Sequence, residues 1–382
     1  MPPPPQPPQP PRPPLGPSEN RLAALRGPRS PQPYTARKIT ALTANPACAR
    51  RAVLDAAGVD KAVLAQRMGY EPRFGRSPFA ISRELAFEAL VKWGGYAELI
   101  RLLREQLDVP VAEAAVADLT DVGGDTSLLR RAKETRRLLR NLVSGSDQRL
   151  ILDSPVLTLE VAGQTAYLEP HALTHRIGGH FYVAEIRSFA AIDGQANPSA
   201  VAQTTKQAAV YVLALRRTFE AVGLDPEQIA HQFLLVCPKD FSNRPYGRLV
   251  DLRQELDALE FQLTRLRRAD DLALRLPESA TLDLDRHESE LDSSVGALDA
   301  SYTPDCLSFC EMARYCRDEA TACAAPARLG GAVRNGLPGV DSTRTALSLI
   351  DGTLAAGPAE AQAVDQLRAA DRLRRLRQGG AA

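Results

Sequence analysis

Residues 166–189, AYLEPHALTHRIGGHFYVAEIRSF, mark the place where the residue pattern changes from helix-like to strand-like. β-Branched and aromatic residues are common in Ala166–Leu173 and Phe181–Phe189, and Gly178-Gly179 between them suits a hairpin turn. Val156–Val161, just before this stretch, has a similar composition. We therefore predict three consecutive β-strands in this part of the chain.

Helix-like patterns lie on both sides of these strands. The predicted helices before them are Ala49–Ala57, Ser82–Val91, Ala97–Gln106 and Thr126–Leu142. Arg37–Leu42 suits either a short strand or the lead-in to a helix. After the strands, Asn197 is a good N-cap for a long helix that ends at Gly223. Gln232–Cys237 then has the length of a strand, and Leu252–Arg268 is helical again. This order predicts an α/β fold in which helices flank a mixed sheet.

The composition bounds the class of protein. The 382 residues are 44% hydrophobic, which suffices for one large domain or two ordinary ones. The net charge of +1 excludes a protein held on nucleic acid by bulk charge alone, so such binding needs a local patch. Six cysteines are too few for a disulfide-stapled secreted fold. The longest apolar run, Ala208–Leu215, is far short of a membrane span. We expect a soluble, cytoplasmic protein that does not contact membranes.

Three segments follow from the distribution of proline, alanine and glycine. Residues 1–33 are rich in proline and are predicted to be a disordered tail, which could also dock a proline-binding domain. Residues 34–323 form the predicted main domain. Residues 324–382 are rich in Ala, Gly and Arg and contain one predicted helix, Glu360–Arg377.

Three cysteines lie close together at Cys306, Cys310 and Cys316. Closely spaced cysteines in an intracellular protein usually share a metal, and a fourth thiolate would complete the ligand set. The candidates for that fourth ligand are Cys48, Cys237 and Cys323. Cys48 begins a predicted helix beside two arginines, and both features favour a thiolate. Cys237 lies in an apolar strand and suits a buried structural thiol. The alternative is that the three are unconnected cysteines on an amphipathic helix.

Glu185 and Arg187 lie on one face of the strand FYVAEIRSF. They suit either a metal-binding carboxylate beside a cation that orients an attacking water, or a structural ion pair at a strand edge. Glu169 and His171, predicted to share a face of the preceding strand, are candidates for a second ligand. An even hairpin loop pairs His171 with Ile186 and places it on the face opposite Glu185. A β-bulge or an odd loop would bring the two onto one face.

Two further helical features are candidates for substrate contacts. Gln207 and Tyr211 are four residues apart on the long helix, and Gln203 extends their face, where they could bind phosphates and position an acid. The helix around Arg130–Arg140 is rich in arginine, and it suits a phosphate-contacting surface or an ordinary solvated face.

Together these motifs resemble the RecB-like branch of the PD-(D/E)XK nuclease superfamily, and most nearly the iron–sulfur exonucleases typified by the CRISPR-associated exonuclease and the nuclease domain of AddB. The family motifs PD, E-x-K and Q-x-x-x-Y correspond here to Pro170-His171, Glu185-Ile186-Arg187 and the stretch from Gln207 to Tyr211. Cys48 and the late cysteine trio correspond to the four cluster ligands of that family. The resemblance spans roughly Thr40 to Cys316.

The resemblance implies two cofactors and a substrate. A 4Fe–4S cluster would be held by Cys48, Cys306, Cys310 and Cys316, and it would staple the two ends of a nuclease-like domain. Mn²⁺ or Mg²⁺ would be held by Glu88, His171 and Glu185, with Glu84 and Glu169 as alternatives to the first two. The ion would activate water for attack on a DNA phosphodiester. Arg187 would supply charge, and Gln207 and Tyr211 would position the DNA.

The departures from the family pattern leave more than one reading of the function. His171 stands where the family has Asp, Arg187 stands where it has Lys, and the cysteine trio opens with a three-residue gap. An Arg stays protonated and cannot act as a base. The chain is therefore either an active DNA nuclease or a catalytically inactive module that binds nucleic acid or a partner. A third reading is a zinc-stapled α/β protein without a nucleic-acid role. A helicase, or a defence or repair partner, would be a separate chain.

Overall fold

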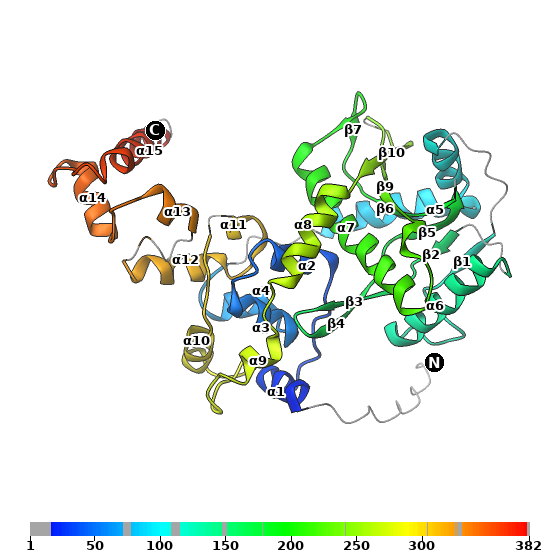
Figure 1. The fold of residues 1–382 in the computed structure, drawn as a ribbon, viewed down its shortest axis with the longest axis horizontal. Coiled ribbons are helices and arrows are strands. Elements are labelled where there is room, and N and C mark those ends of the chain that lie inside the picture. Colours follow the sequence, from blue (N-terminus) through cyan, green and yellow to red (C-terminus); the bar gives the residue numbers. More distant parts are fainter. Residues whose placement is uncertain are drawn as a thin grey trace.

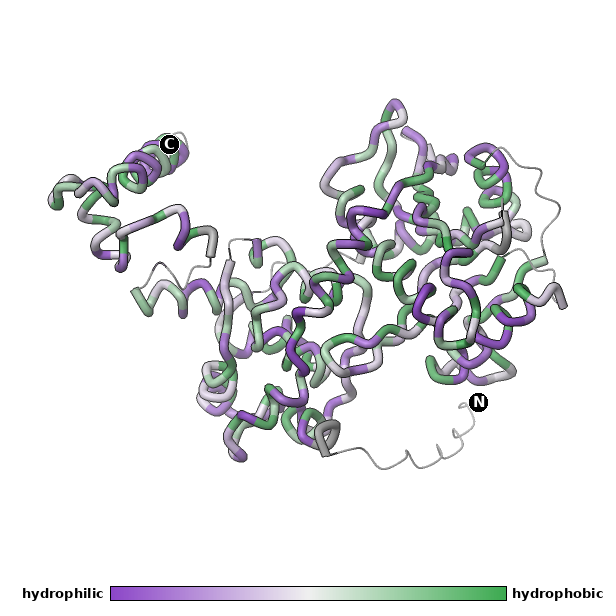
Figure 2. The backbone as a smooth tube through the Cα atoms, in the orientation of Figure 1, coloured by the Kyte–Doolittle hydropathy of each residue, from purple (hydrophilic) through white to green (hydrophobic). Residues whose placement is uncertain are grey.

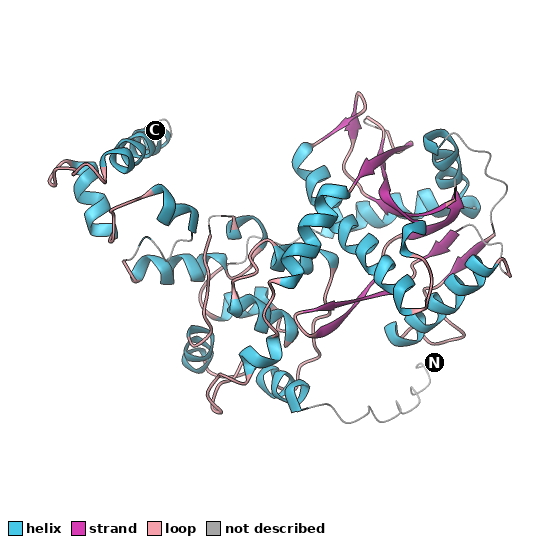
Figure 3. Ribbon diagram, viewed as in Figure 1, coloured by secondary structure: helices cyan, strands magenta, loops and turns pink. Residues whose placement is uncertain are grey.

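The computed structural model describes residues 17–71, 78–107, 115–146, 151–177, 179–240, 242–303, 305–324, 326 and 331–379. Its centre is a six-stranded sheet in the order β1-β2-β5-β6-β9-β10 (Figures 1 and 3). The strands are β1 (Val116–Asp118), β2 (Ile151–Asp153), β5 (Ala172–Ile177), β6 (His180–Ile186), β9 (Ile229–Pro238) and β10 (Pro245–Asp251). The pairs β1–β2 and β6–β9 are parallel and the others are antiparallel. This confirms the predicted mixed sheet.

A β-bulge sets the register between β5 and β6. Ile177 pairs with His180, and Thr174 pairs with Tyr182. Between these two pairs the register shifts by one residue. Ala172 pairs with Ala184 in this shifted register. The next residue on each strand is His171 and Glu185, which therefore lie opposite each other. The even-loop pairing considered above would have separated these two side chains, and the bulge brings them together.

The predicted single strand Ala166–Leu173 is wrong. It divides into the end of β4 (Gln164–Leu168) and the start of β5, because the segment at Glu169-Pro170 leaves the strand and a proline has no N–H for a sheet ladder. β4 pairs instead with β3 (Leu157–Val161) in a separate hairpin outside the main sheet. Ala162 and Gly163 both have positive φ at its turn. A second small hairpin joins β7 (Ala191–Ile192) and β8 (Gln195–Ala196). Gly178 lies outside the described residues.

Helices cover both faces of the main sheet. On one face, α5 (Pro78–Leu107) packs against β6 and β10. It contains non-helical φ and ψ angles from Trp93 to Tyr96, which confirms the predicted break at Gly94-Gly95. On the other face lie α6 (Leu128–Ser144) and α7 (Pro198–Ala221). Asn197 caps α7 by accepting bonds from the N–H groups of Ser199 and Ala200. The apolar core of this face includes Phe181 and Phe219, whose rings meet edge to face.

A helical region adjoins the sheet and joins segments from both parts of the chain (Figure 1). Its helices are α1 (Pro17–Arg26), α2 (Ala36–Thr43), α3 (Ala49–Ala56), α4 (Lys61–Arg67), α8 (Arg253–Thr264), α9 (Ala269–Ala273), α10 (Glu288–Gly296), α11 (Cys306–Phe309) and α12 (Ala313–Ala322). The prediction that residues 1–33 are a disordered tail is wrong for α1, because Leu22 and Leu25 are buried in the core. Residues 1–16 lie outside the described residues.

Three further helices extend away from the rest at the C-terminal end (Figure 1). They are α13 (Gly331–Gly336), α14 (Thr343–Asp351) and α15 (Ala361–Gly379). Their small core consists of Val340, Leu349, Ala363 and Val364. Hydrophilic and hydrophobic residues mix along α15 (Figure 2), which exposes Leu373 and Leu376 among its arginines. None of the described helices has the length and hydropathy needed to cross a membrane.

Candidate active site

Charged side chains line up across the end of the sheet where β6 ends and β5 begins. We call them the sheet-end row, which consists in order of Glu84, Arg187, Glu185, His171, Glu88, Lys92 and Asp153. Each neighbouring pair joins an acid to a base, with contacts from 2.6 to 3.8 Å. Three of its members lie four residues apart on one face of α5, and the rest come from the ends of strands.

Glu185 is the central group of this row. Its side chain has no exposed surface, and its Oε2 accepts a 2.7 Å bond from Arg187. Its Oε1 lies 3.3 Å from His171 Nδ1, and neither of these two atoms has another side-chain hydrogen-bond partner among the described residues. Burial alone would raise the pKa of Glu185, yet the charges of His171 and Arg187 hold it below its usual value. Glu185 is therefore a buried carboxylate that stays ionised.

Glu88 lies on the other side of the His171 ring from Glu185. Its Oε2 is 3.8 Å from His171 Nε2, while its Oε1 accepts from Lys92 at 2.6 Å. Lys92 also contacts Asp153 Oδ1 at 2.7 Å, at the end of β2. The three predicted metal ligands, Glu88, His171 and Glu185, thus lie in a line instead of surrounding one point.

Arg187 links Glu185 to the helices on both faces of the sheet. Its guanidinium donates to Glu84 Oε1 at 3.2 Å on α5 and to Gln207 Oε1 at 3.1 Å on α7. Burial acts to lower the pKa of Arg187, but Glu185 and Glu84 raise it above its usual value. Tyr211 lies one turn after Gln207, and burial together with the Glu185 charge raises its pKa well above the usual range. Arg187 and Tyr211 therefore stay protonated at neutral pH.

Glu169, a candidate metal ligand, and Arg131, a candidate phosphate contact, pair with each other instead. Glu169, the alternative to His171, forms an ion pair with Arg131 at 2.6 Å, and Arg131 also donates to the carbonyl of Ser154. This pair holds α6 against the sheet, so Arg131 is not part of a phosphate-contacting surface. The exposed cations of α6 lie on its outer face, at Arg130, Lys133, Arg137 and Arg140.

The predicted cluster ligands all come from the helical region. Cys48 is the N-cap residue of α3, and Cys306 begins α11, with Cys310 at its C-terminal end and Cys316 in α12. Burial is the main cause that raises the pKa of Cys310, Cys316 and Tyr302; Cys48 adds to the first two shifts, and Cys306 and Cys316 add to that of Tyr302. Cys48 therefore lies within electrostatic reach of Cys310 and Cys316.

The donor set at these cysteines fits a cluster in chemical type. Burial raises the pKa of Cys310 to about 11 and that of Cys316 to about 12, although a nearby arginine opposes each shift. Such thiols are neutral unless a metal deprotonates them. N–H donors already contact two of the sulfurs, since Asn45 lies 3.5 Å from Cys306 Sγ and Arg50 lies 3.1 Å from Cys316 Sγ. Among the described residues, no three His, Cys, Asp or Glu side chains converge as ligands of one metal ion.

We call the contacts between residues 45–61 and residues 295–319 the cysteine junction. Arg50 forms a two-point ion pair with Glu319, at 2.8 and 2.9 Å. Asp55 is buried between Arg51, at 3.2 Å, and Lys61, which also lies 3.9 Å from Glu311. Of these ion pairs, Arg50–Glu319 and Lys61–Glu311 join the two ends of the main domain, and Asp55 holds Arg51 and Lys61 in place within the first segment.

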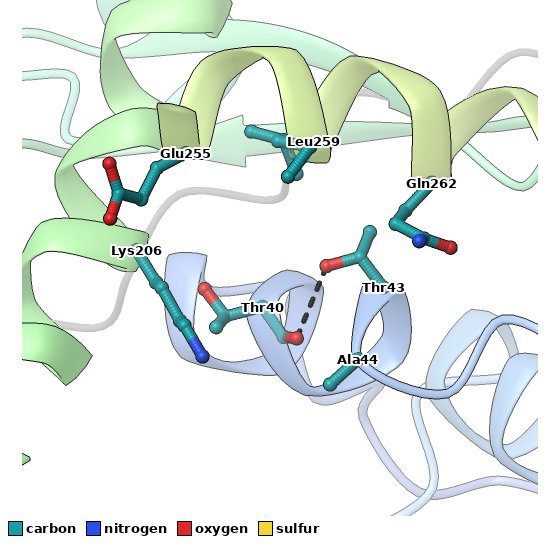
Figure 4. Close-up of a pocket in the computed structure, with 8 residues that line it drawn as sticks. Thr40, Thr43, Ala44, Lys206, Glu255, Leu259 and Gln262 are labelled. Carbon is teal, nitrogen blue, oxygen red and sulfur yellow. Dashed lines mark hydrogen bonds between the residues drawn. The ribbon is translucent and has the colours of Figure 1, made fainter. Parts of the chain in front are cut away.

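A groove beside α7 runs from Gln207, which contacts Arg187 of the sheet-end row, to residues 305–309. One cavity of about 380 Å³ is lined by Gln207 and, among others, by Arg37, Gln203, Lys206, Ser308 and Phe309. A second cavity of about 220 Å³ shares Thr40, Ala44 and Lys206 with the first. In Figure 4 the Lys206 ammonium is directed toward α2, and Glu255 and Gln262 come from α8. Arg37 and Lys206 are exposed and form no ion pair with any described residue, whereas Asp305 and Glu255 add negative charge to the walls.

Comparisons with known proteins give only weak likeness. No protein-family model matches the chain, and no curated protein matches its sequence. A crystal structure from Eubacterium rectale, described as "Putative exonuclease", has 10% identity and a TM-score of 0.31, and the match covers 67% of this chain and 84% of that one. The structure of SSO0001 has 15% identity and a TM-score of 0.19 over 43% of this chain and 84% of that one. Similarities this weak carry no argument about the site.

Sequence reasoning missed Asp153, Lys92, Arg50 and Arg51. Lys92 follows Glu88 by four residues on a predicted helical surface, so helical spacing could have identified that pair. Asp153 ends a strand of only three residues, ILD, which has too little pattern to predict. Arg50 and Arg51 were noted only as neighbours of Cys48. Their burial depends on contacts with residues about 250 positions later in the chain.

Proposed function

We propose that this chain is a metal-dependent DNA nuclease of the iron–sulfur RecB-like type. The observation that carries the proposal is the buried, ionised Glu185, whose Oε1 lies 3.3 Å from His171 Nδ1, with no other side-chain partner for either atom among the described residues. An unpaired polar atom of this kind is costly in a protein interior, by about 1–3 kcal/mol. A divalent cation bound by both atoms would remove that cost.

The residue types favour Mn²⁺ over Mg²⁺. A carboxylate and a neutral imidazole suit Mn²⁺, whereas Mg²⁺ prefers oxygen ligands alone. With Nδ1 turned to the ion, His171 would carry its proton on Nε2, facing Glu88, which would then orient the ring instead of binding the ion. When bound, the ion would supply Lewis acidity to the scissile phosphate and the attacking water.

The remaining groups would bind and orient the phosphodiester. Arg187 is permanently charged and fixed by Glu84 and Glu185, so it can stabilise negative charge that develops on the phosphate. Gln207 accepts from Arg187 through Oε1, which leaves its amide N–H groups for the groove that it lines. Arg37 and Lys206 would contact the backbone of DNA in that groove. Tyr211, whose pKa is raised by burial and by the Glu185 charge, keeps its proton. Cys48, Cys306, Cys310 and Cys316 would hold a 4Fe–4S cluster.

The second candidate, an inactive module that binds nucleic acid or a partner, also rests on an observation. In the sheet-end row, Lys92 contacts both Glu88 and Asp153, and Arg187 contacts both Glu84 and Glu185, so each of the four acids already has a cationic partner. A hydrogen on His171 Nδ1 would satisfy Glu185 as well. The row could then be complete as a set of structural ion pairs, without any metal.

The Glu185→Gln variant distinguishes these candidates. We expect it to lose at least about 10³-fold of the DNA cleavage rate with Mn²⁺, because the charge that holds the ion is removed. It should also lose Mn²⁺ binding measured by calorimetry, while iron and sulfide contents stay those of the parent. The control is Glu227→Gln, a change to an exposed carboxylate away from the row. Absence of both cleavage and Mn²⁺ binding in the iron-loaded parent would exclude the nuclease and leave the inactive module. Zinc in place of iron would instead favour a zinc-stapled α/β protein without a nucleic-acid role.

A further inference from the structure

The segment that carries Cys48 presents fixed N–H donors to two of the predicted cluster ligands. Arg50 Nη1 lies 3.1 Å from Cys316 Sγ, and Asn45 Nδ2 lies 3.5 Å from Cys306 Sγ. Asn45 is held in place by a second contact, to the carbonyl of Ser301. Both donors belong to residues 45–51, whereas both sulfurs belong to the late trio.

Arg50 is held more firmly than any contact with a sulfur alone requires. Its Nε donates to the carbonyl of Val295 at 3.0 Å, and its Nη2 donates to that of Leu298 at 3.1 Å. The guanidinium also forms a two-point pair with Glu319, and the side chain is only 2% exposed. A group bound on every edge and shut off from water keeps its charge at a fixed distance from Cys316.

We propose that Arg50, assisted by Asn45, raises the reduction potential of the cluster bound at these cysteines. The inference rests on the 4Fe–4S cluster of the proposed function. Reduction adds one electron to the cluster and its sulfur ligands, so the sulfurs become more negative. A fixed guanidinium and N–H···S bonds stabilise the reduced state more than the oxidised one. Arg50 is a positioning and tuning residue, and it does not contact the scissile phosphate.

Glu319 acts with the opposite sign. It lies one turn after Cys316 on α12, and its two-point ion pair partly neutralises the charge of Arg50. Its own negative charge disfavours an added electron on the cluster. Replacing Glu319 should therefore raise the potential, whereas replacing Arg50 should lower it. A purely structural role for the pair would not produce shifts of opposite sign.

The test is a potentiometric measurement on anaerobically purified full-length protein. Each cluster takes one electron from the reductant, passing from the 2+ to the 1+ state, and the change is followed by visible absorbance and electron paramagnetic resonance. We expect a lower midpoint potential for Arg50→Gln and a higher one for Glu319→Gln. Arg217→Gln, which breaks an exposed pair with Glu220, is the matched control and should leave the midpoint unchanged.

The outcomes separate this inference from the proposed function. Protein without iron and sulfide would overturn the cluster, and the inference with it. A loaded cluster with the same midpoint in all variants would overturn only the tuning by Arg50. If the Arg50→Gln variant does not load iron, the midpoint potentials of Glu319→Gln and Arg50→Lys are compared with that of the parent instead. The lysine variant keeps the charge but loses the two-point geometry, so its midpoint should fall less than that of a neutral variant.

Discussion

The sheet-end row and the cysteine junction use the same residue types but expose them differently. In the junction, the side chains of Arg50, Arg51, Asp55 and Lys61 are all no more than 3% exposed, and only the outer acids Glu311 and Glu319 reach solvent, at 22% and 35%. In the row, Glu185 alone is fully buried, and its neighbours Arg187, His171 and Glu88 keep between 11% and 21% of their side-chain surface in contact with solvent.

The difference separates charges that hold the fold from charges that a ligand can reach. A completely buried ion pair is costly to break, because the partner left behind has no water. A partly exposed pair can exchange one partner for a phosphate or a metal ion at smaller cost. The comparison therefore predicts large stability effects at the junction and large functional effects at the row.

The largest stability effect is expected for Asp55→Ala at the junction. This change leaves Arg51 and Lys61 buried without their carboxylate, so the free energy of unfolding should fall by about 3–5 kcal/mol. Chemical denaturation measures it. Glu220→Ala, which breaks an exposed pair with Arg217, should cost only about 0–1 kcal/mol. Equal effects for the two variants would show that the comparison is wrong.

The pH dependence of stability offers a second check on Asp55. Burial would raise the pKa of Asp55, but Lys61 and Arg51 hold it below the ordinary value of 3.8. The stabilisation that this group provides is fully present above that value and is lost as the pH falls below it. Asp55→Asn should therefore flatten the acid limb of the unfolding curve, relative to the parent.

An intermediate effect is expected for Arg187→Met in the row. Without Arg187, burial should raise the pKa of Glu185, so the acid limb of the pH–rate profile for cleavage should move to higher pH. We expect about a 10²-fold loss of kcat/KM at neutral pH and a smaller loss for Arg187→Lys. An unmoved acid limb would mean that Glu185 does not control the reaction. If the inactive module is correct, neither variant changes activity.

The smallest effect is expected for Lys206→Gln in the groove. Loss of one phosphate contact should weaken DNA binding a few-fold and reduce the slope of log affinity against log salt by about 1. Fluorescence anisotropy at several salt concentrations measures both. Arg275→Gln, an exposed cation outside the groove, is the control. A slope equal to that of the parent would place the DNA elsewhere.

The sequence was informative where local rules decide the structure. Asn197 and Gly94-Gly95 correctly predicted a helix start and a helix break, because caps and glycines act over a few residues. Glu185 and Arg187 share one face of their strand, as strand periodicity predicts, whereas the contact of Arg187 with Gln207 joins two separate elements and follows from no local rule.

Non-local packing limited the rest. The partner of Glu169 is Arg131, on another element, and nothing in the strand pattern predicts it. The position of His171 depended on a bulge, which shifts the register by one residue without an obvious sequence signal. The helix α1 was missed because proline-rich sequence precedes Leu22 and Leu25, whose burial depends on helices much later in the chain.

The long sequence separation across the cysteine junction has a consequence for the order of events during synthesis. Asn45 contacts Ser301, 256 residues later. At about 5–20 residues per second, a ribosome needs on the order of 10–50 s to make the intervening chain. Cys48, Arg50 and Arg51 therefore leave the ribosome long before their partners exist. Assembly of the junction is a late step, and until then two cations destined for the interior remain in water.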